Sequence, residues 1–310
     1  MRAVRCTEAG VAVVDVAEPE GQGVLVEVAS VGICGSDLHL VDMGPRPVTF
    51  GHEVGGTVDG RPVAICPVRY CGDCPSCRKG ATSVCQLGSN TVVGIHRDGG
   101  MADRLIVEAD CLVELPAGVA AADAWLVEPI AVGVHAFEAL PLEPDMRVAI
   151  VGGGTVGLVA AALARHRGCE VDLVARHPHQ QAAARRLGAG LEPSGKYDVA
   201  MDAAGTESAA REAIRLCRPG GWFVIAGIYW GDVTLPGLAL TLKELKVLPV
   251  VYYGHVRGER EIDVAARLLG ELGGLGEALV THRFPLHRAA EAFATAADKA
   301  SGAIKVLVEP

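Results

Sequence analysis

A glycine-rich turn between a strand and a helix is the feature that most constrains the fold. The apolar run Val148–Val151 leads directly into Gly152-Gly153-Gly154-Thr155-Val156-Gly157, which satisfies G-x-G-x-x-G, and the apolar run Leu158–Ala164 follows. In this context Gly152 permits a tight turn, Gly154 lets a pyrophosphate approach a helix amino terminus, and Gly157 lets helix and strand pack closely. We therefore expect a dinucleotide at this turn, with Thr155 and Val156 among its contacts.

Short apolar strands alternate with Ala-rich helices from Arg147 onward, and this alternation predicts a parallel sheet with helices on both faces. The expected strands are Val148–Val151, Val171–Val174, Val199–Asp202 and Trp222–Ala226, and the expected helices are Val156–Arg167, Gln180–Leu187 and Ser208–Leu216. Past Lys246–Tyr253 one more helix is expected, over Glu261–Leu272. The chain before about Pro116 is instead rich in Gly and Pro and has alternating apolar stretches such as Val24–Val31. This first third predicts an irregular, β-rich lobe.

The length of 310 residues favours two domains, because single cores usually stop growing near ~250–300 residues. We expect boundaries near Glu128 and Gly254, giving segments 1–128, 129–254 and 255–310. A net charge of −9 argues against nucleic acid and anionic membrane surfaces, and so favours a small-molecule substrate. The uncharged run Val148–Ala164 is too short and too rich in glycine to span a membrane. The amino terminus does not resemble a signal peptide, so the chain is expected in the cytoplasm. We also expect a homodimer or homotetramer.

Four of the ten cysteines, Cys71, Cys74, Cys77 and Cys85, form a C-x2-C-x2-C-x7-C cluster. Four thiolates this close in sequence can surround one tetrahedral zinc ion and leave no open coordination position, so this site is expected to be structural. Two local disulfides, four unrelated thiols or an iron–sulfur cluster are the alternatives. Five further cysteines are expected to be core residues: Cys6, Cys66, Cys111, Cys169 and Cys217.

A second group of candidate metal ligands is scattered along the chain. Cys34 and His52, together with a carboxylate such as Glu53 or Glu128, could hold a zinc ion with one position open for substrate. A zinc ion in such a site lowers the pKa of a coordinated alcohol and so favours hydride loss.

The segment that follows Cys34 supplies a route for the proton. Ser36 could accept the proton and His39 could pass it to solvent, while Asp37 could orient a ligand.

The end of the second expected strand indicates which nicotinamide cofactor is bound. The strand Val171–Val174 is followed by Ala175, Arg176 and His177, where folds that bind NAD usually carry an acidic residue. Arg176, with His177, could bind a 2′-phosphate, which favours NADP. Asp172 would favour NAD if the strand ended early.

Together these motifs resemble the zinc-containing medium-chain dehydrogenase/reductase family, which includes alcohol, sorbitol, glucose and threonine dehydrogenases. The likeness runs through the catalytic-cysteine segment Gly32–His39, the Gly51-His52-Glu53 motif, the cysteine loop Cys71–Cys85 and the turn Gly152–Gly157. Near the end, Thr281–Leu286 and Ile304–Val306 are similar to the family's closing segments.

The resemblance implies an α/β protein in which a GroES-like β-rich catalytic domain holds an inserted Rossmann domain with a doubly wound parallel sheet. It also implies that Lys305 contacts the cofactor pyrophosphate. Leu126-Val127-Glu128-Pro129 resembles the polyol and sugar dehydrogenase version of the third zinc position, so Glu53, Glu128 or a water molecule could complete the shell. The shortened stretches between His39 and Gly51 and between His52 and Cys71 leave the substrate open.

The activity predicted from these features is hydride transfer between a secondary alcohol, polyol or sugar and NAD(P), with two zinc ions per chain and NADP favoured. A zinc-free quinone reductase is one alternative, and the metal-ligand candidates argue against it. A zinc-containing dinucleotide sensor without turnover is another.

Overall fold

The computed structural model describes the backbone of residues 1–310 and every side chain except that of Ser89. The chain forms two compact units. Unit 1 contains Met1–Ala131, Tyr252–Gly276 and Val280–Pro310, and unit 2 contains Val132–Val251 with Glu277–Leu279. The carboxy-terminal segment therefore returns to unit 1, and unit 1 resumes at Tyr252, slightly before the boundary expected at Gly254.

Unit 2 is built on a five-stranded parallel sheet with the order β12-β11-β10-β8-β9. Its strands are β8 (Arg147–Val151), β9 (Glu170–Val174), β10 (Tyr197–Asp202), β11 (Cys217–Ile225) and β12 (Lys246–Pro249). An isolated parallel bridge pairs Asp172 of β9 with Gly190, at the edge of the sheet that β9 forms. The order is thus that of a doubly wound dinucleotide-binding sheet, whose strand order reverses between β8 and β10.

The helices of unit 2 follow its strands, as the alternation predicts. They are α4 (Thr155–His166), α5 (Pro178–Arg186), α6 (Glu207–Leu216) and α7 (Gly237–Leu242), and α3 (Val127–Glu138) leads into the unit. The inner strand β8 is apolar, and its residues Val148–Ile150 are fully buried because helices cover parallel sheets on both faces. The expected strands and helices of this region are confirmed, with ends that differ by a few residues.

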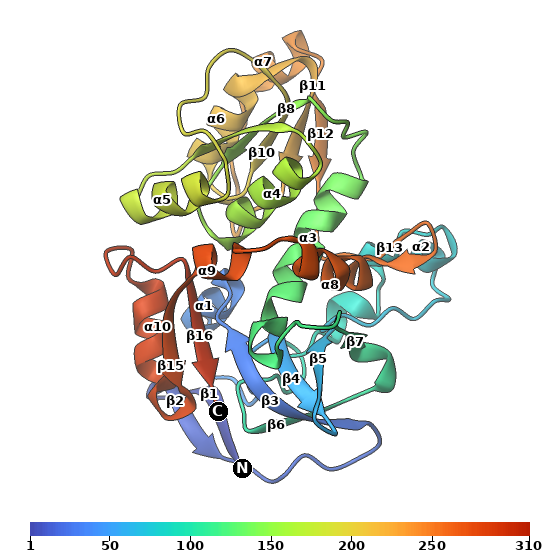
Figure 1. Ribbon diagram of the computed structural model, residues 1–310, viewed down its shortest axis with the longest axis vertical. Helices are drawn as coiled ribbons and strands as arrows, with labels where there is room; N and C mark the ends of the chain where they lie inside the picture. The colour runs from blue at the N-terminus through green and yellow to red at the C-terminus, as the bar shows by residue number, and fades with distance from the viewer. The chain divides into compact units, whose positions relative to one another are not determined.

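Unit 1 is mainly antiparallel and contains a seven-stranded sheet with the order β15-β16-β3-β4-β5-β7, in which β6 also pairs with β3. The strands are β3 (Val24–Gly32), β4 (Glu53–Val58), β5 (Arg61–Ile65), β6 (Arg104–Val107), β7 (Leu112–Glu114), β15 (Val280–Pro285) and β16 (Lys305–Glu309), and β1 (Arg2–Thr7) pairs separately with β2 (Gly10–Asp15). Figure 1 shows the carboxy-terminal strand β16, drawn in red, beside β3, drawn in blue. Strands that are far apart in the sequence therefore share one sheet.

The helices of unit 1 are short and lie around this sheet. They are α1 (Gly35–Asp42), α2 (Pro75–Arg78), α8 (Glu261–Glu271), α9 (Leu275–Leu279, which ends in unit 2) and α10 (Ala289–Ala297). A further hairpin joins β13 (His255–Val256) to β14 (Glu259–Arg260). The five cysteines expected in the core are all buried: Cys6, Cys66, Cys111, Cys169 and Cys217.

None of the helices in the described chain is long and apolar enough to cross a membrane.

Candidate functional site

The four-cysteine loop of unit 1 brings its sulfur atoms together. The Sγ atoms of Cys71, Cys74, Cys77 and Cys85 all lie within 4.8 Å of one another, and none of these cysteines is in a disulfide. Cys71 Sγ is 3.6 Å from Cys85 Sγ and 3.9 Å from Cys77 Sγ. The geometry therefore favours a single metal ion over paired disulfides at this loop.

Backbone N–H groups of the same loop point at the sulfurs. The Cys71 N–H donates to Cys85 Sγ at 3.3 Å, and the Cys74 N–H donates to Cys71 Sγ at 3.2 Å. Such donors stabilise thiolates, and the N–H groups of Cys77 and Gln86 lower the pKa of Cys74 to about 6. Burial instead raises the pKa of Cys77 to about 12. A tetrahedral zinc ion fits this donor set, since four thiolates supply a complete shell.

A second group of ligands forms where β3 ends and β4 begins. One ligand atom from each of Cys34, His52 and Glu53 lies within 4.8 Å of the other two. Cys34 is the residue before α1, and His52 is the residue before β4. Glu53 is the first residue of β4 and pairs with Gly32 at the end of β3. Three mixed ligands leave a coordination position open, which is the arrangement of catalytic zinc sites.

Asp37 orients the histidine of this group. Its side chain is fully buried, accepts a hydrogen bond from the Cys34 N–H at 2.9 Å, and places Oδ1 3.5 Å from His52 Nδ1. Burial lowers the pKa of His52, but the Asp37 carboxylate and Cys34 outweigh this effect, so that the pKa is raised well above its usual value. A carboxylate on one ring nitrogen is the arrangement that directs the other nitrogen of a histidine toward a metal.

The two residues expected to move the proton both lie on α1. Ser36 Oγ is 3.4 Å from His52 Nε2, on the other side of the ring from Asp37. His39 lies one helical turn further along α1 and is exposed. Ser36 is therefore beside the ligand group and His39 is in solvent.

Glu53 is held by a lysine from the far end of the chain. Lys305 Nζ donates to Glu53 Oε1 and Oε2 at 2.8 and 2.6 Å, and to the Ile33 carbonyl at 2.9 Å. Gly32 makes room for this carboxylate, because a Cβ atom at residue 32 would overlap Glu53 Oε2. Lys305 is only 2% exposed, so its position does not agree with the expected contact to the cofactor pyrophosphate. Its donors are engaged inside unit 1, where they compensate the charge of a candidate ligand.

Glu128 is placed near the three-ligand group without being part of it. It lies in the first turn of α3 and is partly buried, and burial raises its pKa to about 7. Its electrostatic neighbours include His52 and the Tyr253 hydroxyl. Among the two glutamates considered from the sequence, Glu53 is the one whose carboxylate joins Cys34 and His52.

Sequence reasoning missed the two tyrosines beside Glu128. Tyr253 is fully buried, and Tyr252 adopts a left-handed backbone with φ of 53°. Tyr252 interacts electrostatically with both His52 and Glu128. The sequence signal is a pair of adjacent tyrosines, separated by two residues from the end of β12, the last strand of unit 2.

The glycine-rich turn of unit 2 has the expected local geometry. Gly152 has φ of 128°, which favours glycine, and Gly154 is the residue before α4. A Cβ atom at Gly157 would overlap the Gly152 carbonyl, so helix and strand need this glycine to approach one another. A Cβ at Gly154 would instead meet no atom within 4 Å, which leaves open space at the amino terminus of the helix. This turn follows β8, at the point where the strand order reverses.

The neighbouring strand β9 does not end early. Asp172 lies in the middle of β9, and its Oδ2 accepts a hydrogen bond from the Tyr197 hydroxyl at 2.7 Å. Beyond the strand end, Arg176 is exposed, and its guanidinium donates to Ser208 Oγ at 2.9 Å. His177 is the residue before α5, and its ring stacks on that of His179. An exposed cation, Arg176, thus follows the end of β9, and the Asp172 carboxylate accepts a hydrogen bond from Tyr197.

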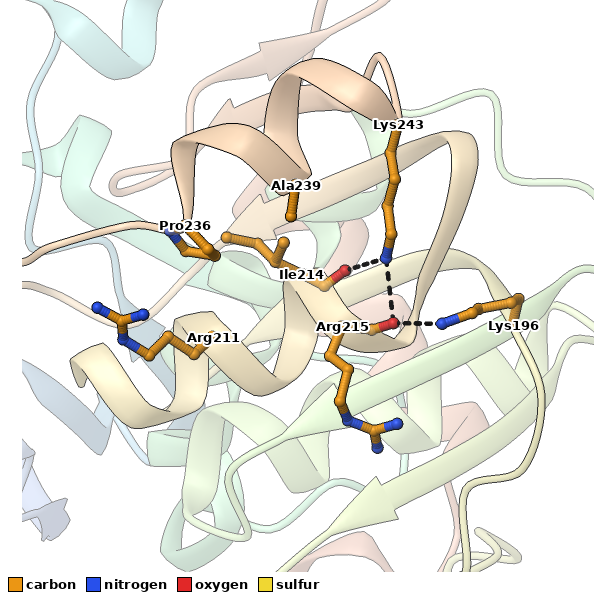
Figure 2. Close-up of a pocket in the computed structure, with 7 residues that line it drawn as sticks. All are labelled: Lys196, Arg211, Ile214, Arg215, Pro236, Ala239 and Lys243. Atoms are coloured by element: carbon orange, nitrogen blue, oxygen red, sulfur yellow. Dashed lines mark hydrogen bonds between the residues drawn. The ribbon is translucent and has the colours of Figure 1, made fainter.

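A hollow of unit 2 lies apart from this turn. Figure 2 shows that Lys196, Arg211, Arg215 and Lys243 line it together with the apolar Ile214, Pro236 and Ala239. Lys243 Nζ donates to the carbonyls of Ile214, Arg215 and Cys217 at 2.7, 3.1 and 2.9 Å, and Lys196 Nζ donates to the Arg215 carbonyl at 2.7 Å. The two lysines therefore cap the end of α6, where unpaired carbonyls and the helix dipole favour cations.

Comparison with protein families assigns most of the chain. Residues 20–117 match the alcohol dehydrogenase GroES-like domain, and residues 155–269 match the zinc-binding dehydrogenase domain. The first region carries all the candidate metal ligands except Glu128, and the second begins within the glycine-rich turn.

Similar proteins of known name act on polyols and sugar acids. L-galactonate-5-dehydrogenase of Escherichia coli K12 is 30% identical over 309 residues, covering 89% of this chain and 88% of the relative. The structure of galactitol-1-phosphate dehydrogenase from Escherichia coli is 29% identical with a TM-score of 0.89, and the match covers both chains completely. A protein of Sinorhizobium meliloti 1021, described as a zinc-binding dehydrogenase and bound to NADP, is 28% identical with a TM-score of 0.88, covering 100% of this chain and 99% of the other.

Proposed function

The chain belongs to the zinc-binding dehydrogenase family with an alcohol dehydrogenase GroES-like domain, and on that premise we propose that it transfers a hydride between a secondary alcohol, polyol or sugar and NADP. The observation that carries the proposal is the group of Cys34, His52 and Glu53, whose ligand atoms lie within 4.8 Å of one another. The names of the relatives, such as L-galactonate-5-dehydrogenase, support the polyol and sugar class.

Cys34, His52 and Glu53 would hold the catalytic zinc. Bound there, zinc supplies Lewis acidity, which lowers the pKa of a substrate hydroxyl. Asp37 keeps His52 oriented, and Lys305 holds the Glu53 carboxylate in place through hydrogen bonds to both of its oxygens. These contacts preorganise the ligands before substrate arrives.

The proton of the substrate hydroxyl leaves through α1 in this proposal. The Ser36 hydroxyl accepts it and releases its own proton in turn. His39, exposed one turn further along the helix, takes up that released proton and transfers it to solvent. The hydride goes to the nicotinamide of a dinucleotide held by the turn Gly152–Gly157 of unit 2.

Replacing Cys34 by Ser tests the catalytic assignment. We expect this variant to lose one of two zinc ions and its turnover, while NADP binding stays within about twofold because the glycine-rich turn is intact. Zinc is counted by elemental mass spectrometry and NADP binding is measured by fluorescence titration. Unchanged turnover in Cys34→Ser would refute the proposal, and NADP binding without turnover in the parent would favour a sensor.

The substrate itself is identified by a screen. Polyols, aldoses, sugar acids, amino alcohols and secondary alcohols are offered with NADP, and reduced cofactor is followed by absorbance. A purified protein that contains no zinc yet reduces quinones would instead support the zinc-free alternative, against which the two assembled ligand groups argue.

The preference for NADP is proposed to come from Arg176, which would bind the 2′-phosphate with the help of His177. We expect Arg176→Ala to lower kcat/KM for NADP by about tenfold to a hundredfold and to leave the value for NAD nearly unchanged. Asp172→Asn is the matched control, because Asp172 is bonded to Tyr197 and should not affect the preference. An NADP preference that survives Arg176→Ala contradicts the assignment.

We further propose that the chain assembles as a homodimer or homotetramer through the edge of the unit 2 sheet. Strand β12 ends that sheet, and Val247 and Val251 are exposed on and just after it, with Leu238 and Leu242 exposed on α7. An apolar edge strand favours pairing with another strand. Light scattering of the parent and of Val247→Lys tests this, and a monomeric parent would contradict it.

A cytoplasmic location is part of the same proposal. All ten cysteines are free in the structure, which suits a reducing compartment.

A further inference from the structure

The segment Tyr252–His255 contacts Tyr70 and Thr82 of the four-cysteine loop region, and its two tyrosines interact electrostatically with Glu128. We propose that the loop serves the reaction as well as the fold, because Tyr70 and Thr82 hold this segment and thereby position Tyr253 and Tyr252 beside the candidate catalytic centre. Tyr70 and Thr82 are then positioning residues. The inference rests on the proposed dehydrogenase activity and adds a role for the structural zinc site.

On the loop side, Tyr70 makes the first connection. It directly precedes Cys71, whose N–H donates to Cys85 Sγ at 3.3 Å. The Tyr70 hydroxyl donates a hydrogen bond to the Tyr253 carbonyl. A change in the cysteine cluster is therefore transmitted to the Tyr253 backbone through a single side chain.

Thr82 makes the second connection. Its Oγ1 is 3.1 Å from His255 Nδ1, and the His255 ring packs edge-on against Tyr70 with ring centroids 5.4 Å apart. Gly254 lies directly against the loop, since a Cβ atom there would be 2.8 Å from the Ser83 nitrogen. Only glycine permits this close approach.

The other side of the segment is fixed by α8. The Gly254 N–H donates to Glu261 Oε2 at 2.5 Å, and the Glu261 N–H donates to the Gly254 carbonyl at 2.9 Å. Glu261 is 3% exposed, so these reciprocal bonds are shielded from water. The segment is thus held between the cysteine loop and a helix.

On the catalytic side, the same segment presents its two tyrosines. Tyr253 is fully buried beside Glu128, and burial together with that carboxyl raises the pKa of Tyr253 well above its usual value. Tyr252 interacts with His52 and Glu128 from a left-handed backbone conformation. A non-glycine residue in that conformation is strained and persists only where its surroundings hold it. The contacts from Tyr70 and Thr82 provide that restraint.

Tyr70→Phe and Thr82→Val test the inference, because each removes one side-chain hydrogen-bonding group and keeps the shape. We expect each to lower kcat/KM by about fivefold to tenfold, the equivalent of one hydrogen bond, mainly in kcat. Zinc content should remain two per chain and NADP affinity within twofold. Hydrogen exchange of residues 251–256 should accelerate. Tyr197→Phe, which removes a tyrosine hydroxyl bond in unit 2, is the matched control and should change neither turnover nor exchange at 251–256.

The outcomes separate this inference from the proposed function. If Tyr70→Phe and Thr82→Val keep both zinc ions and turn over like the parent, the positioning role is wrong. If they lose the structural zinc instead, Tyr70 and Thr82 serve only the loop and the inference fails. If the parent turns over no alcohol, the proposed function fails, and exchange at 251–256 in Tyr70→Phe still decides whether the loop holds the segment.

Discussion

Lys305 Nζ donates to both carboxylate oxygens of Glu53, at 2.8 and 2.6 Å, although 252 positions separate the two residues in the chain. Both side chains are almost completely buried. Strand β16 lies beside β3 and β3 lies beside β4, so that Lys305 reaches Glu53 across the strand that ends at Gly32. The pair places a compensating cation next to a candidate zinc ligand.

Replacing Lys305 by Met should destabilise unit 1, because the Glu53 charge would stay buried without its partner. We expect the free energy of unfolding to fall by about 3 kcal/mol, measured by urea denaturation followed by Trp125 fluorescence. The exposed pair Arg283–Glu309 supplies the control, and Arg283→Met should cost under about 1 kcal/mol. If Lys305→Met instead binds NADP more weakly and keeps its stability, Lys305 contacts the cofactor pyrophosphate.

Asp37→Asn should weaken zinc at the Cys34 and His52 site. Asparagine retains an oxygen for the Cys34 N–H but loses the charge that faces His52 Nδ1, so we expect a tenfold to hundredfold lower zinc affinity. Dialysis against zinc buffers followed by elemental analysis measures this loss. The four-cysteine zinc is an internal standard and should be retained; equal affinity in parent and variant would show that Asp37 does not orient the ligand.

Gly154→Ala and Gly157→Ala should separate cofactor binding from packing. A Cβ at Gly154 meets no protein atom, so this variant should keep its thermal stability and bind NADP about tenfold more weakly. A Cβ at Gly157 overlaps the Gly152 carbonyl, so that variant should lose roughly 1–3 kcal/mol of stability. Calorimetry measures the stability and fluorescence titration measures the NADP affinity. Full NADP affinity in Gly154→Ala would show that the pyrophosphate does not bind at this turn.

Lys243→Met should loosen the end of α6 without affecting turnover. Lys243 donates three hydrogen bonds to carbonyls at this helix end, whereas Lys196 donates one. Figure 2 shows the Lys243 bonds to the Ile214 and Arg215 carbonyls and the Lys196 bond. We expect Lys243→Met to cost about 1–2 kcal/mol and Lys196→Met about half as much. Hydrogen exchange of residues 207–217 measures both. Lost activity at unchanged stability would indicate that the basic hollow binds a ligand rather than capping the helix.

Patterns that are local in sequence predicted the matching parts of the structure. The alternation of strands and helices from Arg147 to Ala226 was sufficient for four of the five strands of the unit 2 sheet, because helix and strand periodicity depend on neighbouring residues. The four-cysteine cluster was equally predictable, since its ligands lie within fifteen residues of one another. The glycines of the turn were identified for the same reason.

Three features are visible only in the tertiary structure. They are the Glu53–Lys305 pair, the position of Glu53 rather than Glu128 beside Cys34 and His52, and the contacts of the segment Tyr252–His255. Each depends on strand register or on loops that meet from distant parts of the chain. The sequence by itself determined the dinucleotide turn, the cysteine loop and the family of the fold. Pairing across a sheet is not encoded by spacing, because register is set by the packing of all strands at once.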